Sequence, residues 1–101
     1  MSENKNWRDP IHPGEILADE LAEIGIGGAQ LAERLNVPDN RIYQILKGKR
    51  AITADTALRL GRFFGTGPKI WLALQNDYEL DVAQHEQNVD LDKIIPYRVA
   101  Q

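Results

Sequence analysis

Residues 39–50 concentrate side chains that suit contact with a nucleic acid. Asn40 and Gln44 carry amides, which form paired hydrogen bonds with adenine, and Arg41 carries a guanidinium, which does the same with guanine. In recognition helices the N-terminal residues contact the bases. The sequence therefore predicts that Asn40, Arg41 and Gln44 contact base edges in double-stranded DNA.

The other polar side chains of this region suit the DNA backbone. Hydroxyl, ammonium and guanidinium groups hold phosphates and carry little sequence information. The residues that we assign to phosphates on this basis are Tyr43, Lys47, Lys49 and Arg50. Gln30 joins them because it lies near the start of the preceding predicted helix, where free N–H groups favour an anion.

The charge distribution favours the same surface. The 101 residues have a net charge of −3. Residues 39–62, in contrast, hold six basic and two acidic side chains, for a charge of +4, and the stretches on both sides are acidic. A short charge run discriminates weakly by itself, because a solvated helix face has a similar composition. Its agreement with the exposed amides and the helical spacing favours DNA binding.

These side chains need a helix that projects from a small helical domain. Apolar residues recur at steps of three and four, and strand-like alternation is absent. We predict an all-α helix-turn-helix fold of five helices, over residues 13–24, 29–35, 39–46 and 54–64 and from 68 to at least 82. Ala32 is small enough for the second and third helices to cross closely.

Turn chemistry supports these boundaries. Pro13 is expected at the start of the first helix, with Ile24 on its inward face. Asn36 is expected to end the second helix in the left-handed conformation. Thr53 is the predicted N-cap of the fourth helix, and Asp55 in its first turn opposes the helix dipole.

Other chemistries lack the residues that they require. The chain has no cysteine and two histidines, so a metal site has few ligands. His85-Glu86 would begin a zinc-protease motif, but Val89 stands where the second histidine is needed. His12 is expected to help begin the first helix. We therefore predict no metal, no cofactor and no enzymatic activity, and a cytoplasmic protein without a membrane span.

Six segments carry a family resemblance in matching order and spacing. They are HPGEIL (12–17), QLAERL (30–35), NRI (40–42), GKRAITADTALRL (48–60), FGT followed by Pro68 (64–68) and WLALQ (71–75). On these motifs residues 12–80 resemble the HigA-type antitoxins, within the phage-repressor-like (lambda-repressor-like) helix-turn-helix proteins. The chain departs from the family at Asn36, where glycine is frequent. Tyr43 and Gln44 occupy positions that vary, so the operator sequence cannot be read.

The resemblance implies a homodimer that binds a palindromic operator and represses its own operon. It also implies a partner, an RNA-cleaving HigB-like toxin that the protein silences. For the dimer interface the last helix offers an apolar stripe, from which we select Ile70, Tyr78 and Val82. Trp71 and Leu74 are assigned to the core, because a short chain needs its aromatic residues inside.

The predicted organisation is a flexible arm over residues 1–12, a helix-turn-helix domain over 13–87 and an irregular tail over 88–101. Two other functions stay open. One is a stand-alone repressor without a toxin. The other is a partner-binding protein that uses the fold only as a scaffold, through the tail or through the acidic residues Asp19, Glu20 and Glu23.

Overall fold

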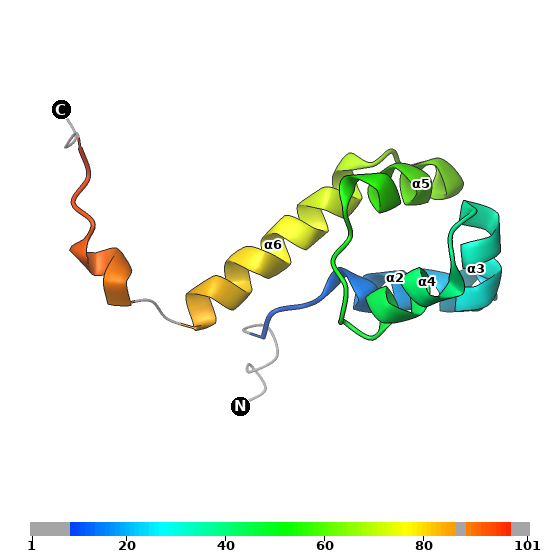
Figure 1. Ribbon diagram of the computed structural model, residues 1–101, viewed down its shortest axis with the longest axis horizontal. Coiled ribbons are helices and arrows are strands. Elements are labelled where there is room, and N and C mark those ends of the chain that lie inside the picture. Colours follow the sequence, from blue (N-terminus) through cyan, green and yellow to red (C-terminus); the bar gives the residue numbers. More distant parts are fainter. Residues whose placement is uncertain (1–8, 87–88, 98–101) are drawn as a thin grey trace.

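The structure is a computed structural model, and it describes residues 9–86 and 89–97 (Figure 1). Its elements are α2 (Pro13–Ile24), α3 (Gly28–Leu35), α4 (Asp39–Leu46), α5 (Ala54–Phe64), α6 (Lys69–His85) and the 3-10 helix η2 (Val89–Lys93). The described part of the chain contains no strand, which confirms the all-α prediction. α6 continues past Val82 to His85. Within the described ranges no helix is long and apolar enough to cross a membrane.

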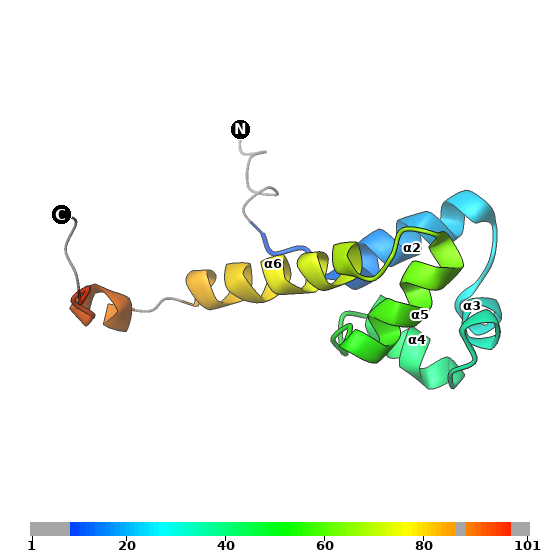
Figure 2. The same ribbon diagram turned by 90° about the horizontal axis from the view of Figure 1, so that it is seen from above.

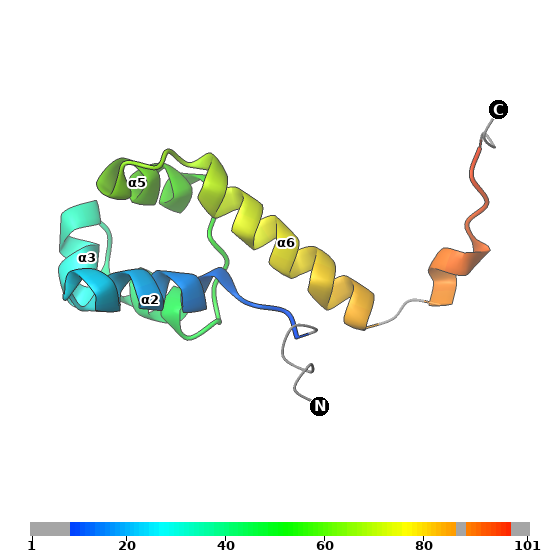
Figure 3. The same cartoon turned by 180° about the vertical axis from the view of Figure 1, so that it is seen from behind.

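The shorter helices α2 to α5 form a cluster from which the long α6 leads away toward the C-terminus (Figures 1 and 2). Seen from behind, α2 lies across the base of this cluster (Figure 3). α6 contacts α2 near the N-terminal end of α2. One apolar core joins the helices, and α3 and α4 share the most extensive contacts. The fully buried core residues are Leu17, Leu31, Ala32, Ile42, Ile45, Ala57 and Leu60.

The end of α2 corrects one predicted core position. Ile24 is 49% exposed, so its assignment to the inward face is wrong. Gly25, with a φ of 76°, turns the chain back at this point, and the N–H of Ile26 bonds to the carbonyl of Leu21. Ile26, which follows the helix end, then packs against the core. A hydrophobic contact just past a helix end commonly accompanies such a left-handed cap.

Two other predicted caps lie where they were expected. Asn36 has a φ of 65°, and the N–H of Val37 bonds to the Ala32 carbonyl at 3.0 Å, which closes the C-terminus of α3. Thr53 is the N-cap residue of α5, but its side chain makes no capping hydrogen bond. The N-terminus of α5 is stabilised by the carboxylate of Asp55 in the first turn.

The HPGE motif docks the start of α2 on the end of α4. The His12 ring accepts a hydrogen bond from the Gly14 N–H at 2.9 Å, which confirms that this histidine helps begin the helix. Pro13 occupies the first turn, as predicted. A Cβ on Gly14 would overlap the Ile45 carbonyl oxygen, so only glycine permits this approach of the two backbones. The motif therefore fixes α2 against α4.

The predicted arm and tail lie partly outside the described residues. The arm, 1–12, is described only from residue 9 onward, and the tail, 88–101, over residues 89–97. The tail includes η2, a single short 3-10 helix that the sequence pattern does not indicate. Its apolar side chains Leu91, Ile94 and Ile95 are exposed.

Candidate nucleic-acid interface

The helix-turn-helix unit consists of α3, a short turn and α4. Ala32 is fully buried in the core that α3 and α4 share, as the role predicted for its small side chain requires. Ile42 and Ile45 anchor α4 to the core from one face. Because the core occupies that face, the opposite face of α4 is free to enter a groove of DNA.

Four predicted contact residues share the outward side of α4. Asn40, Tyr43, Gln44 and Lys47 follow one another at steps of three, one and three residues, which places them along one helix face. Asn40 and Lys47 are exposed, Tyr43 is 42% exposed and Gln44 is half-buried at the edge of the face. The structure therefore brings together two amides, a phenol and an ammonium group on one face of α4 and its C-cap.

The start of α3 lies beside this face. A Cβ on Gly28 would lie 3.0 Å from Cε1 of Tyr43, so the tyrosine ring packs directly over the first turn of α3. Gln30, in the same first turn, is exposed. Gln30 and Tyr43 therefore both lie at the first turn of α3, where free N–H groups favour a phosphate.

The turn after α4 is held by backbone hydrogen bonds. Gly48 has a φ of 75°. Its N–H donates to the Ile45 carbonyl at 2.9 Å, and the N–H of Lys49 donates to the Gln44 carbonyl at 2.8 Å. This pair of bonds is the Schellman arrangement, which terminates a helix with a defined exit direction. The exposed side chains of Lys49 and Arg50 follow directly. The turn thus carries two cations next to Lys47.

Arg41 differs from the other predicted base contacts because it is paired within the protein. Its Nη1 donates to Oδ2 of Asp55 at 2.6 Å, and the same oxygen accepts from Nε of Arg59 at 3.0 Å. Arg59 also donates to the carbonyl of Leu35 at 2.9 Å. The Arg41 and then the Arg59 hydrogen bond hold the pKa of Asp55 below its ordinary value. This cluster links α3, α4 and α5 beside the recognition face.

Sequence analysis missed Asp55 as part of this site. It assigned Asp55 to the dipole of α5 alone, and 14 residues separate Asp55 from Arg41. The available signal was an acidic residue within the basic stretch 39–62. The spacing of four residues from Asp55 to Arg59 also favours an ion pair on one helix face.

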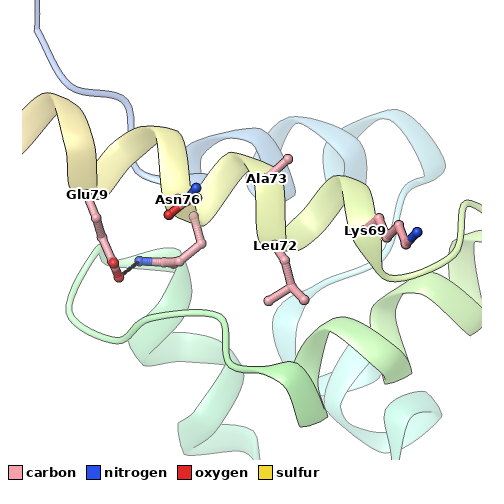
Figure 4. Close-up of a pocket in the computed structure, with 6 residues that line it drawn as sticks. Lys69, Leu72, Ala73, Asn76 and Glu79 are labelled. Atoms are coloured by element: carbon pink, nitrogen blue, oxygen red, sulfur yellow. Dashed lines mark hydrogen bonds between the residues drawn. The ribbon is translucent and has the colours of Figure 1, made fainter. Parts of the chain in front are cut away.

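Gln75 is a second residue that sequence analysis missed. It is buried, and its Oε1 accepts a hydrogen bond from the Ile52 N–H at 2.8 Å. Its Nε2 donates to Glu79 at 2.8 Å, next to a shallow depression on α6 lined by Lys69, Leu72, Ala73 and Asn76 (Figure 4). The signal was a polar residue on the inward stripe of α6. Through its bond to Ile52, Gln75 holds the short segment that leads from the turn after α4 into α5.

The predicted dimer residues have three different environments. Ile70 is 50% exposed, and Val82 is half-buried. The ring of Tyr78 lies edge-on to the His12 ring, with centroids 4.8 Å apart, so this residue packs within its own chain. Trp71 is buried and Leu74 is partly buried, as the sequence predicts. The interface itself stays a prediction.

Comparisons with known proteins agree with this geometry. The helix-turn-helix family profile matches residues 19–71. Virulence-associated protein I of Dichelobacter nodosus is 44% identical over 93 residues, which cover 91% of this chain and 85% of that protein.

Solved structures extend the likeness to the whole fold. A HigA-family addiction module antidote protein from Coxiella burnetii is 49% identical, with a TM-score of 0.85, and the match covers 88% of this chain and 99% of that one. The Pseudomonas aeruginosa antitoxin HigA, solved with the higBA promoter, is 41% identical with a TM-score of 0.82, covering 89% and 99%. This chain therefore belongs to the helix-turn-helix family, and its predicted resemblance to the HigA-type antitoxins is confirmed.

Proposed function

We propose that this protein is a homodimeric repressor that reads a palindromic operator upstream of its own gene with α4. The observation that carries the proposal is the exposed row of Asn40, Tyr43, Gln44 and Lys47 on a helix held out by α3. The base contacts are Asn40, Gln44 and Arg41. Arg41 reaches its base after its ion pair with Asp55 opens. The phosphate contacts are Gln30, Tyr43, Lys47, Lys49 and Arg50. The P. aeruginosa relative, solved with a promoter, supports DNA binding by this fold.

The proposal includes a second partner, an RNA-cleaving toxin that the protein neutralises in the cytoplasm without any enzymatic step of its own. The likeness to antitoxins supports it. A basic toxin would find carboxylates on the outer face of α2, where Asp19, Glu20 and Glu23 are exposed. These residues lie on a different helix from the proposed DNA face, so the two partners use separate surfaces.

The test is binding to a DNA fragment from upstream of the gene, across a salt series, with a scrambled fragment as competitor. Three proposed phosphate contacts per protomer, Lys47, Lys49 and Arg50, are cations. A dimer then neutralises six phosphates. The slope of the logarithm of the binding constant against the logarithm of the salt concentration is therefore expected to be about −5. Equal affinity for the two fragments would contradict the proposal and favour the scaffold function.

Asp55→Asn tests whether Arg41 is available to DNA. The substitution removes a negative charge beside the DNA face and weakens the hold on Arg41, so binding to the operator is expected to tighten by about tenfold at low salt. The exposed ion pair contributes little to stability. The measurement is a titration of each variant with operator DNA. Glu23→Gln, which removes the same charge from an exposed position on α2, is the control.

A weaker affinity for Asp55→Asn would show the reverse. It would mean that the ion pair with Asp55 holds the Arg41 side chain in its binding position. Arg41 would then contact DNA while still paired with Asp55.

A further inference from the structure

His12 lies at the junction of three parts of the fold, although it comes just before the first helix. It is only 7% exposed. Its Nδ1 accepts the hydrogen bond from Gly14, so this nitrogen carries no proton in the neutral ring, and Nε2 carries it. The ring therefore has one acceptor directed at α2 and one donor left for another segment.

The second contact is with the turn after α4. A Cβ built on Gly48 would lie 3.8 Å from Cγ of His12, so the imidazole packs against this glycine. Burial lowers the pKa of His12, and the backbone of Arg50, which lies beside the ring, opposes this shift. Because Nδ1 accepts from the Gly14 N–H, Nε2–H is the ring donor left for this backbone. His12 thus contacts both ends of the segment Gly48–Arg50.

The third contact comes from α6, where the ring of Tyr78 meets the imidazole edge at an angle of 66°. α6 also supplies Gln75, which binds the N–H of Ile52. Residues 48–52 are therefore held at one end by His12, which is itself packed against α6, and at the other end by Gln75.

We propose that His12 is a positioning residue of the DNA interface, which fixes the Gly48–Arg50 turn and thereby aims Lys49 and Arg50 at the phosphates. The inference rests on the proposed function for the role of these two cations. It goes beyond helix capping, because a cap needs only the acceptor Nδ1, whereas positioning of the turn needs Nε2 and the ring. His12 itself contacts no DNA in this role.

Two substitutions separate the two nitrogens. In His12→Asn the side-chain oxygen replaces Nδ1 as the N-cap acceptor, but the side chain is too short to reach the turn. In His12→Gln the longer amide places its N–H₂ near the position of Nε2, while the cap is lost. The first variant keeps the cap without the turn contact, and the second keeps the turn contact without the cap.

The experiment compares full-length wild type, His12→Asn and His12→Gln in two measurements. The first is amide hydrogen exchange in the free protein, which reports the turn without any DNA. His12→Asn is expected to speed exchange at Lys49, whose N–H bonds to Gln44 in the wild type, and to leave the core amides protected. His12→Gln is expected to lower the Tm and to leave Lys49 as protected, relative to the core, as in the wild type.

The second measurement is the salt dependence of operator binding. If Lys49 and Arg50 of both protomers lose their phosphates, the slope of His12→Asn falls from about −5 to about −2, with at least a tenfold loss of affinity at low salt. His12→Gln keeps the wild-type slope. Wild-type exchange and slope in His12→Asn would overturn the inference and leave His12 as a cap alone. Faster exchange at Lys49 without selective operator binding by the wild type would keep the structural part and refute the proposed function.

Discussion

Replacing Arg41 and Gln44 together with alanine is expected to lower the affinity for the operator at least 100-fold and to remove the preference over scrambled DNA. Each paired hydrogen bond with a base contributes about 1–3 kcal/mol of discrimination, and a dimer loses the contacts twice. The lysines that we propose as phosphate contacts stay in place, so binding falls to the non-specific level and remains sensitive to salt. The measurement is competition binding with labelled operator.

The fold should survive this double substitution. Gln44 is at the edge of the core, and the ion pair of Arg41 with Asp55 is exposed, so each truncation costs little stability. Binding of the toxin is expected to stay unchanged, since its proposed surface lies on α2. Arg62→Ala removes the same charge from the end of α5 and is the control for a general loss of positive charge. Loss of both operator and toxin binding would refute the separation of the two surfaces.

Gly14→Ala is expected to destabilise the protein by about 3 kcal/mol, although alanine in place of a helical glycine ordinarily stabilises. The added methyl group would overlap the Ile45 carbonyl oxygen, so α2 would have to move away from the end of α4. For a domain of this size such a loss lowers the Tm by about 15 °C. Thermal unfolding followed by circular dichroism measures the change.

Gly27→Ala is the matched control, because a Cβ at Gly27 meets nothing within 4 Å and its φ is −96°. Its expected cost is below about 1 kcal/mol, the difference between glycine and alanine at an N-cap. Similar losses for the two variants would show that the approach of Gly14 to Ile45 is not what fixes α2 on α4.

Most of the fold follows from local patterns in the sequence. Apolar spacing and boundary residues such as Pro13 and Asn36 place the helices α2 to α5 within a residue of where the structure has them. Such features depend on a few neighbouring residues, which is why a single sequence contains them. Ile24 was misplaced because its exposure depends on how the chain turns back at Gly25.

The sequence predicts which side chains lie on the outward face of α4, but not the contacts that hold this face in position. The outward row on α4 follows from helix periodicity, but the pairing of Arg41 with Asp55 depends on the crossing of α4 and α5. The same holds for the bond from Ile52 to Gln75 and for the approach of Gly14 to Ile45. These contacts join residues distant in the chain, and periodicity contains no information about them.

The pair between Arg41 and Asp55 also constrains how operator preference can evolve in proteins with this arrangement. A change at Asn40 or Gln44 alters an exposed or half-buried side chain and can be selected alone. A change at Arg41 leaves the Asp55 carboxylate with one cation fewer, close to the surface that meets phosphates. Residues 41 and 55 should therefore vary together among related repressors, whereas 40 and 44 vary independently as operators diverge.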